Sequence, residues 1–294
     1  MHCYLCKSNR VHILYQINNW SLYRCNNCSY IFVYPYLNQR QLQKIYRNFK
    51  HNIFEKSQTI LYDAKHSLKF VRKFTKNKKS LLDIGCGSGT FLGEAIKNNL
   101  QVSGIDMSLT LVKYLKSRFR YEIYHGDIIT SKIGHKYDIV TLNQVIEHFS
   151  RPRILIKRCN TLLNNGGLIY IATPNIASIV SKIRKEKFDY VIPPEHLSYF
   201  NKKTLYNLLT SEGFKILEFG TWSYPVDLAG LIKHFLKKDL QVEINNKRKV
   251  DKIQTFDIKR IKYLLFDKLF CRLFYRMLNI NNGGTMIEVI AQKI

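Results

Sequence analysis

Three glycines alternate with other residues directly after a short apolar run of the sequence. Gly85, Gly87 and Gly89 follow residues 81–84, and Asp83 stands two positions before the first glycine. Glycine lets the backbone turn sharply and lets a ligand approach it closely. The spacing differs from the dinucleotide-binding pattern, in which the third glycine comes one residue later. The run therefore predicts a strand that ends in a ligand-binding loop, with a helix after it.

Polar side chains end the apolar runs that follow this loop. Asp106 closes the run 101–106, about 20 positions after the loop, which is the spacing of a carboxylate that binds ribose hydroxyls. Asp127 follows the next apolar run, and Asn143 and Gln144 end the run 137–144. Strand patterns alternate with helical patterns throughout this region, which predicts a parallel sheet covered on both faces.

The order of these motifs over residues 80–176 resembles the class I S-adenosylmethionine-dependent methyltransferases. This resemblance implies an α/β fold with a Rossmann-like, mostly parallel sheet whose last strand is antiparallel. It also implies S-adenosyl-L-methionine as the cofactor. Methyl transfer from a sulfonium is an in-line displacement, so such an enzyme mainly aligns the acceptor with the methyl group. The sequence therefore describes the cofactor site better than the acceptor site.

The resemblance assigns a role to each residue of the predicted cofactor site. The three glycines would pass under the methionine part of the cofactor, and Asp83 would brace their loop near the cationic amino group. Asp106 would accept hydrogen bonds from both ribose hydroxyls, which suits a group with two acceptor oxygens. Met107 would pack on the adenine ring.

Four further residues are assigned to the adenine and to the reacting end of the cofactor. Asp127 would accept a hydrogen bond from the adenine amino group, and Ile128 would pack against the ring. Asn143 and Gln144 would lie beside the sulfonium and the acceptor.

Two histidines are the candidate catalytic residues. Glu147 and His148 follow the run 137–144, as in the ubiquinone-biosynthesis O-methyltransferases and many methyltransferases of glycan and natural-product pathways. The run 194–200 resembles a Glu-His-x-x-x-Phe element of the latter group, and it contains His196. His196 is the first candidate for a general base because a histidine pKa can lie near neutrality; a structural histidine is the alternative. For His148 we expect a structural or acceptor-orienting role. Gln144 stands where some ubiquinone enzymes have a metal-binding glutamate, which disfavours a carboxylate-rich catalytic metal site.

The first 34 residues carry two C-x-x-C pairs. Cys3 and Cys6 are separated by 18 residues from Cys25 and Cys28, a spacing within the range of four-cysteine zinc sites. Each pair offers two thiolates to a tetrahedral Zn²⁺, and a segment this short needs a metal to supply folding energy. We therefore expect a zinc-ribbon-like module with structural Zn²⁺, free thiols being the alternative. The other three cysteines are scattered, which does not fit a secreted disulfide framework.

The sequence divides into three regions. Residues 1–34 form the zinc-ribbon-like module, residues 35–79 a helical lead-in, and residues 80–294 the methyltransferase domain. Within this domain, residues 175–213 are expected to cap the acceptor pocket. Strand patterns at 215–219 and 286–291 predict an antiparallel pair interrupted by a basic helical insertion, residues 225–282. Residues 231–280 of this insertion contain 13 Lys and Arg against 5 Asp and Glu.

The whole chain is strongly basic. Its 47 Lys and Arg against 21 Asp and Glu give a formal charge of +26, which attracts phosphates, nucleic acid or an anionic membrane. The abundance of Lys, Asn, Ile, Tyr and Phe offers a purely compositional explanation. The basic insertion could bind an anionic membrane surface or RNA, or it could pack on its own domain. No apolar stretch is long enough to span a membrane, and no signal segment is evident. The expected location is the cytoplasm, either free or peripheral to the inner face of the membrane.

The predicted function is methyl transfer from S-adenosylmethionine to a small-molecule or glycan-pathway acceptor. The sequence leaves O-, N- and C-methylation open, and it does not indicate the oligomeric state. One alternative is a ribosomal RNA base methyltransferase whose cysteine-rich module binds RNA, which the positive charge suits. A second is a non-catalytic binding protein that has kept the fold.

Overall fold

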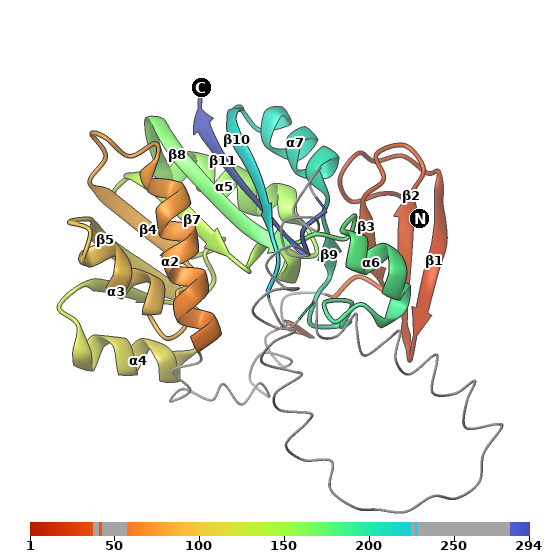
Figure 1. Cartoon of the computed structure of the whole chain (residues 1–294), viewed down its shortest axis with the longest axis horizontal. Helices are drawn as coiled ribbons and strands as arrows, with labels where there is room; N and C mark the ends of the chain where they lie inside the picture. Colours follow the sequence, from red (N-terminus) through yellow and green to blue (C-terminus); the bar gives the residue numbers. More distant parts are fainter. Residues whose placement is uncertain (38–40, 43–57, 225–226, 228–282) are drawn as a thin grey trace, which may run out of the picture.

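The computed structural model describes residues 1–37, 41–42, 58–224, 227 and 283–294, which form two sheets (Figure 1). The larger sheet has seven strands, and the smaller sheet has four. In spatial order, the seven strands are β10 (Phe214–Trp222), β11 (Met286–Lys293), β8 (Leu163–Pro174), β7 (Tyr137–Asn143), β4 (Ser80–Ile84), β5 (Gln101–Asp106) and β6 (Glu122–His125).

The larger sheet is parallel from β8 to β6, and β11 runs antiparallel to both of its neighbours. This arrangement confirms the predicted Rossmann-like fold with an antiparallel last strand. The chain first builds outward from β4 to β6 and then returns to place β7 on the other side of β4. Ligands of open α/β sheets bind at such a reversal, outside the carboxyl ends of the strands.

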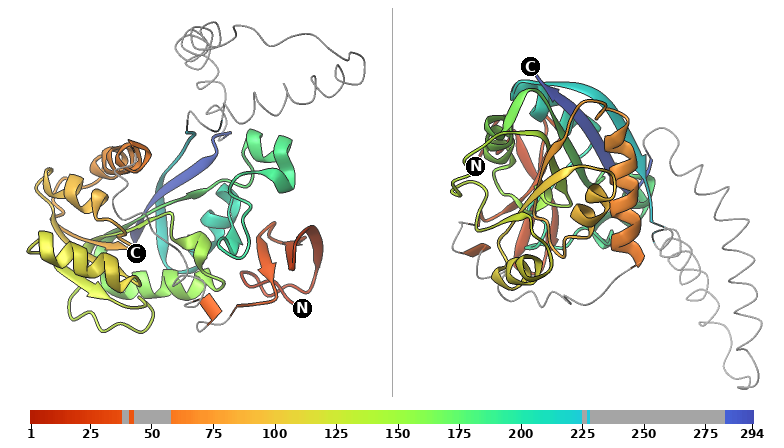
Figure 2. Two further views of the ribbon diagram at one scale, coloured as in Figure 1. Left: turned by 90° about the horizontal axis from the view of Figure 1, so that it is seen from below. Right: turned by 90° about the vertical axis from the view of Figure 1, so that its left-hand side faces the viewer.

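Helices cover both faces of this sheet, as the buried parallel strands require (Figure 2). On one face, α2 (Gln58–Arg72), α3 (Thr90–Ile96) and α4 (Leu109–Arg118) contribute to one apolar core. On the other face, α5 (Pro152–Leu162) and α7 (Lys202–Ser211) contribute to a second core. Two of these helices have favourable first residues: the Ser108 side chain accepts a hydrogen bond from the Leu111 amide at the start of α4, and Pro152 begins α5.

The smaller sheet joins the N-terminal segment to the predicted acceptor cap. Its strands are β1 (Val11–Ile17), β2 (Trp20–Cys25), β3 (Ile31–Tyr34) and β9 (Ser198–Tyr199), in that order. Tyr30 hydrogen-bonds through its hydroxyl to the Ser198 hydroxyl, and Ser198 in turn donates to the Phe149 carbonyl. The cysteine-rich segment therefore shares a sheet with residues 198–199 and a core with α5 and α7.

Short helices complete the cap region. The 3-10 turn η1 (Ile146–His148) follows β7, while α6 (Ile179–Arg184) and η2 (Lys185–Lys187) precede β9. The predicted basic insertion lies outside the described residues except for Asp227, and so does part of the helical lead-in. None of the described helices is both long and apolar enough to cross a lipid bilayer.

Candidate active site

The predicted glycine loop follows β4 at the reversal of strand order. All three glycines have positive φ angles, at which side chains are rarely tolerated. A Cβ atom on Gly85 would lie 2.6 Å from Cγ2 of Val145, so this glycine permits close packing of the loop against the chain after β7. A Cβ atom on Gly87 would meet nothing nearer than a backbone oxygen at 4.0 Å. The backbone at Gly87 therefore forms an open floor on which a ligand can lie.

The Asp106 carboxylate is held beside this floor. Its Oδ2 accepts a hydrogen bond from the Gly87 amide at 2.9 Å, and its Oδ1 accepts one from the Ser108 amide at 2.8 Å. Each carboxylate oxygen has a second lone pair, so both can still accept from ribose hydroxyls. Met107 is 36% exposed beside it, as a residue that packs on an adenine must be.

The predicted adenine contacts after β6 are only partly accessible. The Asp127 Oδ1 accepts a hydrogen bond from the Ile129 amide at 2.9 Å, which fixes the carboxylate at the end of β6. Ile128 is 3% exposed and belongs to the core on the α5 side of the sheet. Ile128 therefore offers little surface to an adenine ring, because most of its side chain is already packed against the protein.

Buried Asp83 and half-buried Asn143 form a pair at the carboxyl ends of β4 and β7. The Asp83 Oδ1 accepts hydrogen bonds from the Thr141 hydroxyl at 2.6 Å and from the Asn143 amide at 3.5 Å. Burial raises the pKa of Asp83 to about 7, so a neighbouring cation would shift it toward the ionised form. The Asn143 Oδ1 is buried without a hydrogen-bond partner in the described part of the chain. An acceptor without a donor beside a carboxylate fits the cationic amino group of S-adenosylmethionine.

The structure gives Gln144 partners that the sequence does not predict. Its amide nitrogen donates to Asp63 on α2 and to the hydroxyl of Tyr224, both at 3.0 Å. Asp63 could have been suspected because it occupies the same helix face as the buried Ser67 and Val71, one and two turns later. Tyr224 follows β10 and gives no comparable signal.

Both predicted catalytic histidines lie together. The ring centroids of His148 and His196 are 5.0 Å apart. His148 Nδ1 lies 2.8 Å from the Glu195 carbonyl, and His196 Nδ1 lies 2.8 Å from the Tyr190 carbonyl. Metal-binding atoms of Glu147, His148 and His196 all lie within 4.8 Å of one another. The three residues thus form one polar cluster that tethers the cap to the loop after β7.

The expected near-neutral pKa of His196 is wrong. His196 is buried, and burial together with the neighbouring His148 lowers its pKa to about 3. Burial also lowers the pKa of His148 and raises that of Glu147 to about 8. At neutral pH the imidazole of His196 is therefore uncharged and too weakly basic to hold a proton.

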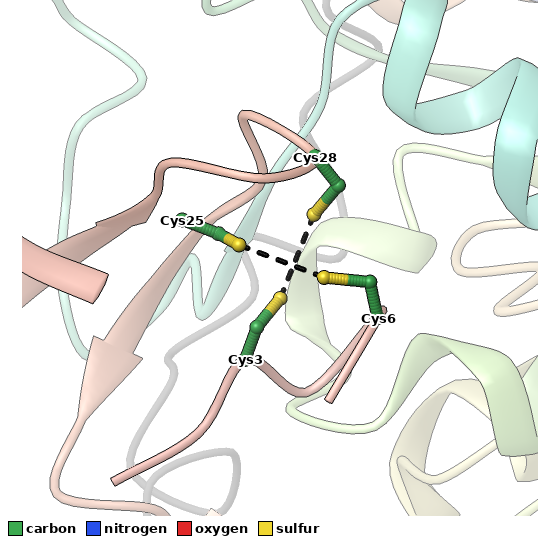
Figure 3. Close-up of side chains that lie close together, drawn as sticks. All are labelled: Cys3, Cys6, Cys25 and Cys28. Atoms are coloured by element: carbon green, nitrogen blue, oxygen red, sulfur yellow. Dashed lines mark hydrogen bonds between the residues drawn. The ribbon is translucent and has the colours of Figure 1, made fainter. Parts of the chain in front are cut away.

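The four N-terminal cysteines converge, as their spacing predicts (Figure 3). The sulfur atoms of Cys3 and Cys28 are 3.6 Å apart, as are those of Cys6 and Cys25. Four sulfur ligands at about 2.3 Å from a tetrahedral zinc ion would lie about 3.8 Å apart. Ser29 adopts a φ of 64°, which explains why glycine is common at this position of zinc knuckles. The donor set and its geometry fit Zn²⁺.

Comparisons with known proteins identify the family of this chain. A family model described as a methyltransferase domain matches residues 49–219. The ubiquinone biosynthesis O-methyltransferase of Coxiella burnetii strain Dugway 5J108-111 is 25% identical over 189 residues, which cover 60% of this chain and 76% of that protein. Its counterpart from strain RSA 331 is 31% identical over 116 residues, but the alignment spans only 37% of this chain and 49% of the relative.

Solved structures show that the fold is shared more widely. A SAM-dependent methyltransferase from Archaeoglobus fulgidus superposes with a TM-score of 0.50 at 23% identity, covering 79% of this chain and 93% of that one. The [4+2]-cyclase SpnF superposes with a TM-score of 0.50 at 17% identity, covering 78% and 80%. Because this fold also carries a cyclase, the fold alone does not identify the reaction.

Proposed function

Because this chain belongs to the methyltransferase-domain family and is an S-adenosylmethionine-dependent methyltransferase, we propose that it methylates a hydroxyl oxygen of a small-molecule or glycan-pathway acceptor. The observation that carries the cofactor assignment is the open backbone at Gly87 with the Asp106 carboxylate fixed beside it. The names of the curated relatives, which are O-methyltransferases, support oxygen as the acceptor atom.

Different residues of the site would bind the cofactor and orient the acceptor. S-adenosylmethionine supplies an electrophilic methyl group. The glycine loop would pass under the methionine part and Asp106 would bind the ribose hydroxyls. Asp83 would lie near the amino group, and the unpaired Asn143 Oδ1 beside it offers that group an additional acceptor. Gln144 follows β7 at the edge where these groups meet, so it faces the acceptor side. The His148–His196 cluster ties the cap to this edge and orients the acceptor.

The test is methyl transfer by the purified chain. Protein is incubated with S-adenosylmethionine carrying an isotope-labelled methyl group and with catechols, nucleotide sugars or total RNA in separate reactions. We expect labelled small-molecule product and S-adenosylhomocysteine in equal amounts. Label in RNA would instead support the ribosomal RNA alternative. Cofactor binding without any S-adenosylhomocysteine would support the non-catalytic alternative.

We also propose that Cys3, Cys6, Cys25 and Cys28 hold a structural Zn²⁺. The support is the convergence of the four sulfur atoms at a spacing that suits a tetrahedral ion. Amide groups also point at the sulfurs, since the Leu5 amide donates to Cys3 Sγ at 3.4 Å. Such donors stabilise thiolates, which are the form that binds metal.

Replacing Gly87 by alanine is expected to weaken S-adenosylmethionine binding at least tenfold. The new Cβ atom would occupy the open floor, and the φ of +52° costs an alanine about 1–2 kcal/mol. Isothermal titration calorimetry measures the loss. Gly134→Ala is the matched control, because a Cβ atom there meets nothing within 4 Å. Equal cofactor affinity in both variants would contradict the assignment of Gly87.

Replacing His196 by glutamine is expected to raise the KM for the acceptor at least fivefold and to leave cofactor affinity within twofold. The reason is that His196 orients the acceptor through the cap, while the cofactor site lies on other loops. Steady-state kinetics with an acceptor that becomes labelled in the test above checks this expectation, with the exposed His12→Gln as control. An unchanged KM would remove His196 from the acceptor site.

A further inference from the structure

Half-buried Asp63 and Gln144 and buried Tyr224 form a polar cluster near the glycine loop. The three residues come from α2, from the loop after β7 and from the segment after β10. The Tyr224 hydroxyl donates to Asp63 Oδ2, and the Gln144 amide donates to the same oxygen at 3.0 Å. The Gln144 amide also lies 3.0 Å from the Tyr224 hydroxyl, which closes a three-membered network. Two donors thus hold one oxygen of the Asp63 carboxylate in place.

The second oxygen of the Asp63 carboxylate, Oδ1, is not held by these donors. Asp63 Oδ1 is buried and has no hydrogen-bond partner among the residues that the structure describes. A buried acceptor without a partner destabilises the folded protein, and more so when it is charged. Such groups call for an explanation, and an absent ligand is one. A hydroxyl group of a bound molecule that reached this oxygen would supply the missing donor.

The position of the cluster ties it to the cofactor site. Gln144 has a φ of 53°, which is strained for a residue other than glycine. Its backbone N–H donates to the Ala172 carbonyl of β8 at 2.8 Å. Strained backbone of this kind gathers at active sites. The next residue, Val145, packs against Gly85 of the cofactor loop. The cluster therefore lies at the strand-order reversal, beside the loop that binds the cofactor.

We propose that Asp63 is the general base, that its Oδ1 removes the proton from the acceptor hydroxyl, and that Gln144 and Tyr224 orient its carboxylate. This inference rests on the proposed O-methyl transfer. The acceptor oxygen forms a bond to the methyl carbon while the bond from that carbon to sulfur breaks. The electron pair of the broken bond stays on sulfur. The hydroxyl proton passes to Asp63 and then to water.

The electrostatics of Asp63 suit this role. Burial raises its pKa to about 6, while hydrogen bonds from Tyr224 and Gln144 and the nearby His66 oppose the rise. The negative charge of Asp227, which is also close, adds to it. Tyr190 faces the same region, through its hydrogen bond to Asp227. A base with a pKa just below the working pH is ionised and still accepts a proton effectively.

Two other buried titratable groups near the acceptor side, His196 and Glu147, are less suited to this task. The pKa of His196 is about 3, so it gives up a proton too readily to act as a base. The pKa of Glu147 is about 8, so it is mostly protonated at neutral pH. Asp63 is the described carboxylate near Gln144 that combines a free oxygen with a suitable pKa.

The test compares two catechol probes in wild type and in Asp63→Asn. The probes are 3,4-dihydroxybenzoate, whose hydroxyls are protonated near pH 8, and 4-nitrocatechol, whose nitro group leaves one hydroxyl ionised there. We expect Asp63→Asn to lower kcat at least tenfold for the first probe and less than threefold for the second. A merely structural defect would lower both equally and would overturn the proposal.

Two controls separate a base from a structural carboxylate. Asp138 lies at the opposite end of β7 and accepts hydrogen bonds from two backbone amides and two side chains. Asp138→Asn therefore tests the loss of a structural carboxylate, and it should affect both probes alike. Tyr224→Phe removes a donor that favours ionised Asp63, so its acidic pH limb should move to higher pH. An unmoved limb would contradict the orienting role of Tyr224.

The ionisation of Asp63 can also be measured without any acceptor. Infrared difference spectra of the wild type between pH 5 and pH 8 should contain a protonated-carboxyl band that is absent from Asp63→Asn. If wild type methylates neither probe but the band titrates near pH 6, the choice of catechol acceptors fails while the ionisable Asp63 stands. If no such band titrates between these pH values, the proposal for Asp63 fails whatever the acceptor.

Discussion

Asp106→Ala is expected to weaken S-adenosylmethionine binding at least a hundredfold. The change removes the carboxylate that would accept hydrogen bonds from both ribose hydroxyls, and each such bond to a charged group contributes about 1.5–3 kcal/mol. The same carboxylate also holds the Gly87 and Ser108 amides at 2.9 and 2.8 Å. The variant therefore loses ligand contacts and the support of the loop at once. Calorimetric titration with S-adenosylmethionine measures the affinity.

The matched control for Asp106 is an acidic residue one strand away. Glu122 is exposed and begins β6, so it lies at the amino ends of the parallel strands, whereas Asp106 lies at their carboxyl ends. Glu122→Ala therefore removes a carboxylate without touching the loop. We expect this control to bind the cofactor as the wild type does. If Asp106→Ala retained wild-type affinity, the ribose contact would have to be made elsewhere, and the cofactor assignment of this edge would be wrong.

Cys28→Ser is expected to release the metal and to lower the melting temperature by more than 10 °C. A structural zinc ion contributes folding free energy directly, and about 1 kcal/mol shifts the melting temperature of a domain of this size by about 2–4 °C. Cys28 is buried in the same core as α5 and α7, so its loss reaches beyond the first sheet. Metal analysis of the purified protein and a thermal scan give the two readouts.

Cys159→Ser provides the control for the metal prediction, because Cys159 is equally buried but lies on α5 away from the cysteine cluster. It should keep one zinc ion per chain.

In Cys28→Ser we expect acceptor binding to weaken more than cofactor binding, because β3 pairs with β9, which begins two residues after His196. We expect the KM for the acceptor to rise while cofactor affinity changes by less than about threefold. Zinc retained by Cys28→Ser would contradict the four-cysteine site.

The cofactor side of the site could be predicted because its signals are local. Gly85 and Gly87 follow β4 and Asp106 ends β5, and the positions of strands in an alternating α/β pattern are visible in the hydrophobic periodicity. The cysteine pairs are equally local, since each C-x-x-C brings two sulfurs together within one turn. The four cysteines converge as their spacing predicts, and the Gly87 amide bonds to the Asp106 carboxylate at the carboxyl ends of β4 and β5.

The acceptor side depends on packing between distant segments, which periodicity does not reveal. Asp63 and Tyr224 meet across 161 residues of sequence. The two-residue strand β9 is too short to show a periodic pattern, so its pairing with β3 could not be predicted. The pKa of His196 depends on how deeply the cap buries it, and burial is a property of the folded chain.

The pairing of β3 with β9 sets an order of events during synthesis. The first three strands of the smaller sheet are complete by residue 34, but their partner is residues 198–199. At about 5–20 residues per second, the ribosome needs roughly ten to thirty seconds to deliver that partner. The four cysteines, in contrast, are all made within the first 28 residues. If the cysteines bind zinc, metal capture can precede closure of the sheet, and the free edge of β3 stays without its partner strand for that whole interval.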